Sequence, residues 1–270
     1  MANDMQFFII APPIIWLVWQ YKKLGLLVIG GLTALSCAIP TALTYKNGWA
    51  PVPGFPGPKP NDPANDFMLN SYIKPYTRFT PYIMGILLGY FLHITKNKPV
   101  KINYLVNIWL WAVSWVVGVL VVYGLTLPDR ADIAHGDPNL TLPLGDGANA
   151  IYAGFHRLGW SFALGWVIFA CCRGYGGWVN EFLSWSAFKP LSKISFILYL
   201  IHLDVIPILK GTLHFEFDMS VTLMVIFLLS ALFYNLVFSA VLYVLIELPY
   251  LQTEKLLVSL ILNPKRNKQN

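Results

Sequence analysis

Long apolar runs separated by shorter polar connections dominate this chain. Each run is close to the roughly 20 residues that an α-helix needs to cross about 30 Å of hydrocarbon. None shows the alternating pattern of a barrel strand, and backbone groups in lipid must find partners within the segment, so each run is predicted to be a helix. The sequence thus predicts an all-α, polytopic transmembrane helix bundle of about seven spans. The predicted spans are residues 5–21, 24–43, 79–95, 104–127, 148–172, 194–213 and 221–245.

The composition supports a lipid environment. Of 270 residues, 56% are hydrophobic and 12% are charged, whereas an ordinary soluble domain has roughly 25% charged residues. The net charge of +6 would raise the question of nucleic acid in a soluble protein. Here the positive charges lie mostly between apolar runs, where they orient the chain in the membrane. We therefore expect membrane lipids, and no nucleic acid, as partners.

Basic connections alternate with mixed or acidic ones along the chain. By the positive-inside rule the basic set is cytosolic, which places the N-terminus outside and the C-terminus in the cytosol. Residues 251–270 are then a basic cytosolic tail, and the acidic stretch 129–146 and the connection that holds Glu216 and Asp218 are outside. The predicted cytosolic set is Lys22 and Lys23, residues 96–101, residues 173–193 and residues 265–268.

Proline predicts two local features. Residues 44–75 hold seven prolines and three glycines, so we expect an extended, partly polyproline-like outer loop. This loop is either a passive connection or a lid over an outward cavity, with Trp49 and Phe55 as anchors. Pro12 and Pro13 lie inside the first run and should break or kink it, because proline removes a backbone donor and clashes with the preceding turn.

Ionisable groups at membrane depth are costly, so each is a candidate functional residue. They occur near the start of the first and third runs and within the fifth and sixth runs. The predicted orientation gathers them toward the outer face, where they could line a polar cavity. The candidates are the ionisable residues Asp4, Arg78, Arg157, Tyr199 and His202 and, beside Asp4, the polar residue Gln6.

On the sixth run, Ser195, Tyr199 and His202 follow one another at i, i+4 and i+7, which places them on one helical stripe. Histidine titrates near neutral pH, so His202 could act as base or acid toward a hydroxyl substrate. The alternative is that these groups only form hydrogen bonds with neighbouring helices.

Two charged side chains have structural alternatives. Arg157 either forms an ion pair with Asp4 or Asp204, or holds an anionic group through its planar guanidinium. Glu247 lies at the predicted inner end of the last run, where it could form an ion pair with Lys189 or Lys193.

Several common catalytic motifs are missing from the sequence. It contains no phosphate-binding glycine loop, no Gly-x-Ser-x-Gly elbow and no His-Glu-x-x-His motif. Cys37, Cys171 and Cys172 lie in or beside apolar runs without disulfide or metal-ligand spacing. We predict no metal site.

Four blocks, in order, carry a resemblance to a known family. They are residues 2–8 followed by Pro12, residues 72–90 (YIKPYTRFTPYIMGILLGY), residues 175–202 (YGGWVNEFLSWSAFKPLSKISFILYLIH), and the closing set Glu247, Pro249, Glu254 and Lys255. In these blocks the chain resembles the acyltransferase family 3 membrane proteins, and within them the branch called nose resistant to fluoxetine.

The resemblance implies transfer of an acyl group to a hydroxyl on a lipid, sugar or similar acceptor. The implied partners are the acyl donor and the hydroxyl acceptor, with acyl-coenzyme A as a common donor and no bound cofactor. From their predicted place in the polar cavity, we hypothesise catalytic roles for His202 and Asp4, and substrate contacts for Arg78, Arg157, Tyr199 and Gln6. The alternative on the same scaffold is a non-catalytic transporter of lipids or lipophilic drugs. A seven-helix receptor is disfavoured because the sequence lacks Asp-Arg-Tyr and Asn-Pro-x-x-Tyr at the expected spans.

Family members also carry spans upstream of the block at residues 2–8. Residues 1–250 should therefore form the C-terminal portion of the transmembrane domain, with its N-terminal spans missing. Those upstream spans include a basic residue and a histidine that the family uses in catalysis. We expect this fragment alone to be inactive.

Overall fold

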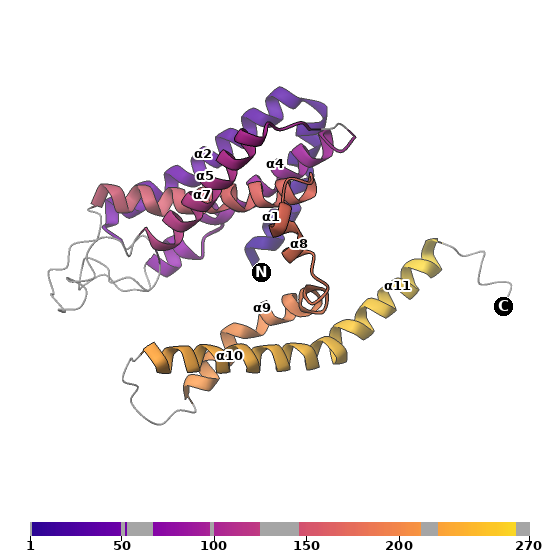
Figure 1. The fold of residues 1–270 in the computed structure, drawn as a ribbon. Coiled ribbons are helices and arrows are strands. Elements are labelled where there is room, and N and C mark those ends of the chain that lie inside the picture. The colour runs from indigo at the N-terminus through magenta and orange to yellow at the C-terminus, as the bar shows by residue number, and fades with distance from the viewer. Residues whose placement is uncertain are drawn as a thin grey trace. The chain divides into compact units, whose positions relative to one another are not determined.

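The computed structural model describes residues 2–49, 52, 67–97, 100–124, 146–211 and 221–262. Its regular elements within these ranges are all helical (Figure 1). They are α1 (Ala2–Gln20), α2 (Lys22–Asn47), the π-helical turn η1 (Met68–Tyr72), α4 (Pro75–Ile94), α5 (Tyr104–Tyr123), α7 (Asp146–Cys172), α8 (Gly177–Leu183), α9 (Phe188–Gly211), α10 (Val221–Leu242), the π-helical turn η2 (Tyr243–Glu247) and α11 (Leu248–Leu262).

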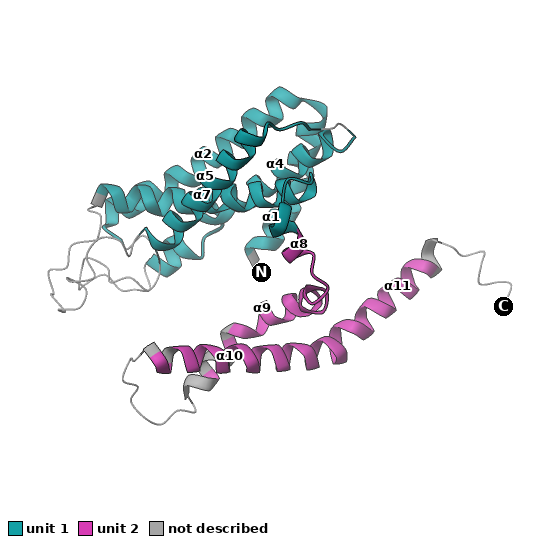
Figure 2. Cartoon of the chain, viewed as in Figure 1, with its two compact units in different colours: residues 1–180 teal, residues 181–270 magenta. Residues whose placement is uncertain are grey.

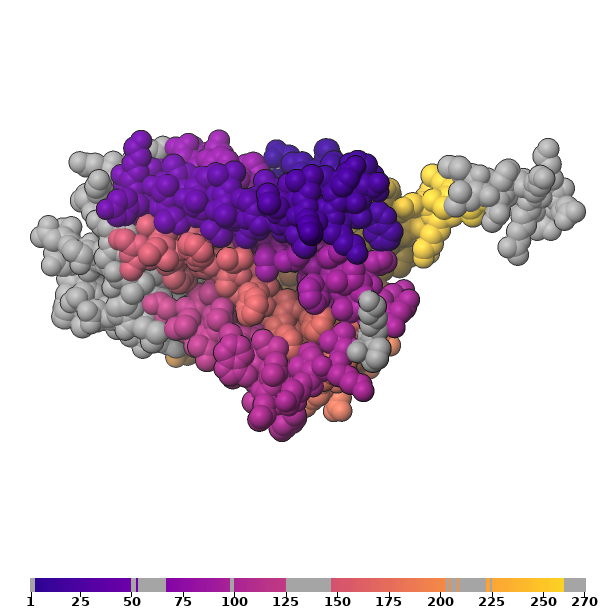
Figure 3. Space-filling view, turned by 90° about the horizontal axis from the view of Figure 1, so that it is seen from above, coloured from indigo at the N-terminus to yellow at the C-terminus, as the bar shows by residue number. Residues whose placement is uncertain are grey.

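The chain divides into two compact units, residues 1–180 and residues 181–270 (Figure 2). In unit 1, α7 packs against α2, α4 and α5, and α1 packs against α2 and α4. Figure 3 shows α1 and α2 side by side on one face of this unit. In unit 2, α9 packs against α10, and α10, η2 and α11 follow one another without a break.

Hydrogen bonds fix the antiparallel packing of α5 on α7. The hydroxyl of Tyr152 near the start of α7 donates to the carbonyl of Val121 near the end of α5. Farther along α7, the carbonyl of Ala163 accepts a bond of 2.9 Å from the hydroxyl of Ser114. Both side chains thereby satisfy their polar groups inside the bundle, as a lipid environment requires.

Gly154 allows α7 to approach α2 closely. A Cβ atom at this position would lie 2.0 Å from the Oγ1 of Thr41 and 2.5 Å from the carbonyl oxygen of Cys37. Both distances are shorter than any real contact of a methyl group, so a larger residue would push the helices apart. Small residues play this part at helix interfaces in membranes, where backbone approach replaces the hydrophobic effect.

Unit 1 has a small apolar core and an apolar exterior. Ile14, Val18, Ile29 and Ile83 form the core where α1, α2 and α4 meet. Large apolar side chains also face outward along most helices, for example Trp109 on α5 with 64% of its surface exposed. Exposure of such a surface to lipid has no free-energy cost, whereas its exposure to water would be unfavourable.

Four helical segments are long and apolar enough to cross a membrane: Lys22–Asn47, Tyr104–Tyr123, Gly147–Cys172 and Val225–Ser259. They correspond to four of the predicted spans. The described residues of the runs at 5–21, 79–95 and 194–213 are helical too, as α1, α4 and α9, but they are not among these four segments. The helices are therefore confirmed, whereas the count of about seven spans is not.

Three local predictions change. Pro12 and Pro13 do not break the first helix, because α1 continues through both residues, and the alternative of a kink stays a prediction. The loop predicted at 44–75 is helical at both ends, since α2 reaches Asn47 and a π-helical turn precedes α4. Residues 251–262 of the predicted tail belong to α11.

Several predicted features fall outside the described residues. They include Phe55 of the proposed lid, most of the acidic stretch 129–146, the connection with Glu216 and Asp218, and residues 263–270 of the tail. Trp49, the other proposed anchor, is buried and packs edge-on against Phe67 with ring centroids 5.9 Å apart. The lid itself stays a prediction.

Candidate functional site

Hydroxyl groups form a buried polar layer between α2 and α4 of unit 1. We use "polar layer" for Ser36, Ser71, Thr77, Thr80 and the arginines attached to them, described below. The hydroxyl of Thr80 donates to the Oγ of Ser36 at 2.9 Å, and Ser36 donates to the carbonyl of Tyr76 at 3.0 Å. Thr77 donates to the carbonyl of Ser71 at 2.7 Å, which ties η1 to α4. These side chains are buried, so each bond is made where water cannot replace it.

Pro81 explains why Arg157 enters this layer. Inside a helix, the carbonyl of Thr77 would accept a bond from the N–H of residue 81, but proline has none. The Nη1 of Arg157 on α7 donates to that carbonyl instead. A proline gap in α4 thus fixes the position of a guanidinium group from another helix.

Arg173 repeats this arrangement at the far end of α4. The carbonyl of Leu92 lies in the last turn, where helical carbonyls lack intrahelical partners. The Nη2 of Arg173 donates to it at 2.6 Å and also to the Oγ1 of Thr95. Because the earlier residues of α4 meet the earlier residues of α7, the two helices run parallel. Arg157 of α7 lies at one end of the contact, and Arg173, directly after α7, lies at the other.

Arg78 attaches to the same end of α4 as Arg157. Its Nε donates to the carbonyl of Tyr72 at 2.7 Å, and its guanidinium carbon lies 4.3 Å from the centre of the Tyr72 ring. The carbonyls that hold Arg78 and Arg157 are therefore only five residues apart in the chain. Both guanidinium groups thus donate to backbone carbonyls of unit 1. The ion pair considered between Arg157 and Asp4 stays a prediction.

Asp4 and Gln6 lie on α1, with exposed side chains. Asp204 lies on α9, in unit 2, so its pairing with Arg157 stays a prediction. In unit 1, Arg78 and Arg157 thus lie at the polar layer, whereas Asp4 and Gln6 lie on α1 with their side chains exposed.

His202 and Tyr199 lie together on α9 of unit 2. The Nδ1 of His202 is 2.6 Å from the carbonyl oxygen of Tyr199, and the two rings lie 5.7 Å apart. A carbonyl can only accept, so we assign the proton of neutral His202 to Nδ1. Nε2 then carries a lone pair that can accept a proton. Ser195 donates to the carbonyl of Ser192 at 2.8 Å. The bonds that the described residues of this stripe form lie within α9, and the alternative of bonds to neighbouring helices stays a prediction.

Glu247 does not form its predicted ion pair. Within the described part of unit 2 no bond joins it to Lys189 or Lys193, and its Oε2 is buried without a hydrogen-bond partner. The residue lies at the end of the π-helical turn η2.

Sequence reasoning missed the hydroxyl residues of the polar layer. Ser36, Thr77 and Thr80 are ordinary in an apolar run, since each can bond within its own helix. Pro81 is the sequence signal that could have indicated this layer, because it leaves the carbonyl of Thr77 without a helical partner and another donor must bond it. His156, which is not among the predicted site residues, stacks on Tyr152 with ring centroids 5.4 Å apart, and its Nδ1 lies 2.9 Å from the carbonyl oxygen of the same residue.

Comparison with known proteins identifies the family. A family model described as "Acyltransferase domain" matches residues 2–244. Nose resistant to fluoxetine protein 6 from Caenorhabditis elegans is 36% identical over 211 residues, which cover 75% of this chain and 24% of that protein. The chain thus spans about a quarter of the length of this curated relative. No solved structure matches. With a family match over most of its length and four long apolar helices, the chain belongs to the acyltransferase 3 family of multi-pass membrane proteins.

Proposed function

We propose that this chain forms part of a membrane acyltransferase that transfers an acyl group to a hydroxyl of a lipid, sugar or similar acceptor. Membership of the family supports acyl transfer as the reaction class. One structural observation supports a substrate site in unit 1: Arg78 and Arg157 bring two guanidinium groups to one end of α4 inside an apolar bundle.

Two cations in an apolar environment favour an anionic ligand. A guanidinium group has five N–H donors, and the described contacts use the Nε of Arg78 and the Nη1 of Arg157. The other donors suit the paired oxygens of a phosphate or carboxylate. We assign Arg78 and Arg157 to an anionic group on the donor or acceptor, and Tyr199 and Gln6 to further substrate contacts.

The reaction balances with a thioester donor such as acyl-coenzyme A. The acceptor oxygen attacks the acyl carbonyl carbon, so a C–O bond forms and the C–S bond breaks. The hydroxyl proton passes to Nε2 of His202, which has a free lone pair because the ring proton is on Nδ1 and is bonded to the carbonyl of Tyr199. The coenzyme A thiolate leaves and takes up a proton. Asp4 is assigned to the same catalytic group, which requires the predicted topology with the N-terminus outside.

The test expresses the complete transcript that encodes this chain and measures transfer of a radiolabelled acyl group in isolated membranes. The His202→Ala variant should lose transfer, because the acceptor hydroxyl loses its base. Thr253→Ala on α11, whose hydroxyl bonds only the carbonyl of Pro249 among described residues, is the control and should keep it. Full transfer by His202→Ala at normal expression would remove the proposed role.

The same membranes separate an enzyme from the alternative, a non-catalytic transporter of lipids or lipophilic drugs. The comparisons do not favour that alternative. Uptake of a lipophilic compound without acyl transfer by any variant, wild type included, would overturn the enzyme proposal.

A further inference from the structure

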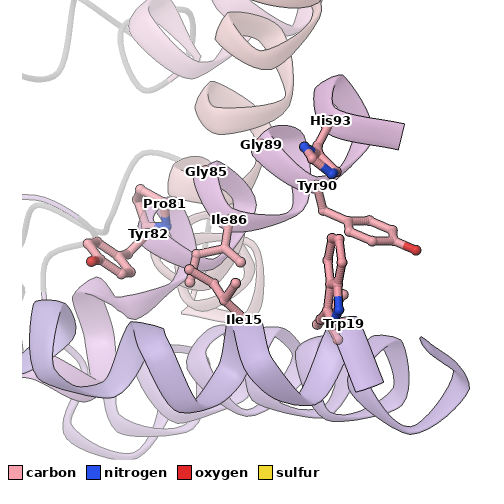
Figure 4. A pocket seen from close by; sticks show the side chains of 10 residues that line it. Ile15, Trp19, Pro81, Tyr82, Gly85, Ile86, Gly89, Tyr90 and His93 are labelled. Atoms are coloured by element: carbon pink, nitrogen blue, oxygen red, sulfur yellow. The ribbon is translucent and has the colours of Figure 1, made fainter. Parts of the chain in front are cut away.

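A groove of about 690 Å³ lies between α1 and α4 of unit 1 (Figure 4). Its volume falls within the range of roughly 300–1,000 Å³ that is typical of sites for small organic ligands. It is lined almost entirely by apolar and aromatic groups, including Ile15, Trp19, Tyr82, Ile86, Tyr90 and His93. Neither the family assignment nor the acyl-transfer proposal uses this groove.

Two glycines form an open stretch of its wall. Gly85 and Gly89 lie one helical turn apart on α4, and a Cβ atom at either position would meet nothing within 4 Å. The groove can therefore bring a ligand flat against the backbone of α4. Broad contact with a flat wall favours a rigid, fused ring system, because such a ligand gains dispersion energy along its whole face without losing internal freedom. A flexible acyl chain has no need of a flat wall.

The groove has one polar end. Trp19 and His93 face each other there with ring centroids 5.7 Å apart, and Tyr90 lies on the preceding turn (Figure 4). At the other end Pro81 and Tyr82 line the wall, and the Tyr82 ring packs against Phe7. An indole N–H, an imidazole and a phenol suit a small polar group such as a single hydroxyl.

The length of the groove also limits its ligand. From Pro81 to His93 the helix rises about 18 Å at 1.5 Å per residue. This is close to one leaflet, half of the roughly 30 Å hydrocarbon thickness. A rigid lipid that spans one leaflet, with its hydroxyl at the interface, matches both the length and the polarity.

The sequence of α4 supplies an independent observation. Leu88, Tyr90 and Lys96 fit the pattern Leu/Val-x1–5-Tyr-x1–5-Lys/Arg that is associated with sterol contact. The pattern is weak alone, since many helices contain it by chance. Here its central tyrosine lines the groove, and its lysine follows directly after the end of α4.

From these observations we propose that the groove between α1 and α4 binds a sterol, with the hydroxyl at Tyr90 and His93 and the ring system against Gly85 and Gly89. The polar layer at Thr77 is sixteen residues away from His93, about 24 Å along α4. Within unit 1 the bound hydroxyl is therefore distant from Arg78 and Arg157, the proposed anion-binding residues, so we assign the sterol as a resident lipid rather than the acceptor.

The test places the protein expressed from its complete transcript in phosphatidylcholine nanodiscs with a tritiated photoreactive cholesterol analogue. The double variant Gly85→Leu, Gly89→Leu fills the wall and should lower labelling about tenfold. Gly165→Leu is the matched control, because a Cβ at this glycine of α7 also meets nothing within 4 Å. It should keep full labelling, and excess unlabelled cholesterol should compete.

A second variant keeps the test decisive should the double variant fold poorly. Tyr90→Phe retains the ring and removes one hydroxyl, so it should weaken cholesterol binding about fivefold. It should leave binding of a 3-deoxy analogue unchanged.

Three outcomes would overturn the proposal: unchanged labelling of well-folded Gly85→Leu, Gly89→Leu, equal loss of both sterols in Tyr90→Phe, or competition by added phosphatidylcholine as strong as by cholesterol. The last would indicate a general lipid surface. None of these readouts depends on acyl transfer, so the two proposals fail separately.

Discussion

The guanidinium group of Arg157 on α7 donates its hydrogen bond to the carbonyl oxygen of Thr77 on α4, one turn before Pro81. Proline created the vacancy, and an arginine from another helix fills it. The contact has two consequences. It joins two helices through a group that lipid cannot solvate, and it holds a positive charge within the bundle.

Replacing Pro81 should therefore reduce the contribution of Arg157 to the stability of the protein. Arg157→Gln alone should cost about 1.5–3 kcal/mol of stability, because a bond from a charged donor to a buried carbonyl is lost. In a Pro81→Ala background the N–H of residue 81 can satisfy Thr77, and the cost should fall by about half or more. A double-mutant cycle of unfolding in bicelles measures this coupling. Additive costs would mean that the two side chains act independently.

The approach of α7 to α2 at Gly154 should tolerate no side chain. Gly154→Ala places a methyl group within 2.5 Å of two oxygen atoms of α2, and overpacking of this kind costs about 1–3 kcal/mol. Gly165→Ala, on the same helix but in open space, should be neutral or stabilising by about 0.5–1 kcal/mol. Thermal unfolding of both variants provides the comparison. Equal stability of the two would show that the helices do not meet as described.

The bond between Thr80 and Ser36 should stabilise the α2–α4 contact modestly. Both side chains are buried and their oxygens are 2.9 Å apart. Hydrogen bonds between membrane helices average about 0.6 kcal/mol in double-mutant cycles. We expect a coupling of that size between Thr80→Val and Ser36→Ala, measured by steric trapping. A coupling of zero would place the two hydroxyls apart.

The charge pattern predicts glycosylation at one defined place. Asn139-Leu140-Thr141 is a glycosylation acceptor sequence within the stretch 129–146, which is predicted to face outside. In eukaryotic cells the chain should carry a glycan that glycosidase removes and that Asn139→Gln abolishes. Protease protection of residues 96–101 on intact vesicles is the complementary assay. Cleavage of those residues from the exterior would reverse the orientation and separate Asp4 and His202 from the outer face.

Part of the fold follows from the sequence by simple physics. A long apolar run in lipid must be helical, because only a helix satisfies its own backbone groups, and α2, α5 and α7 lie where the pattern predicts. Membrane helices tolerate proline where other groups satisfy the freed carbonyls, so Pro12 and Pro13 did not end α1. The span count was harder, since α4 carries Arg78 and Pro81 and is not among the four long apolar segments.

The site depends on the relative register of the helices, which a single sequence does not encode locally. Arg78 and Arg157 were chosen as costly charges at membrane depth, and the structure attaches both to one end of α4. Which carbonyls they would bond could not be read from spacing, because Thr77 and Arg157 are eighty residues apart. The partner of Glu247 was predicted from proximity in the topology alone, and that prediction failed.

In the proposed site Arg157 binds an anionic group of the acyl substrate. The KM for the acyl donor, measured with the protein expressed from its complete transcript, tests this most directly. At matched amounts of folded protein, Arg157→Gln should raise the KM for the acyl donor about tenfold, the loss of one charged hydrogen bond. Arg173→Gln removes the equivalent structural bond at the other end of α4 and should leave KM unchanged. Equal KM values for wild type, Arg157→Gln and Arg173→Gln would contradict the account.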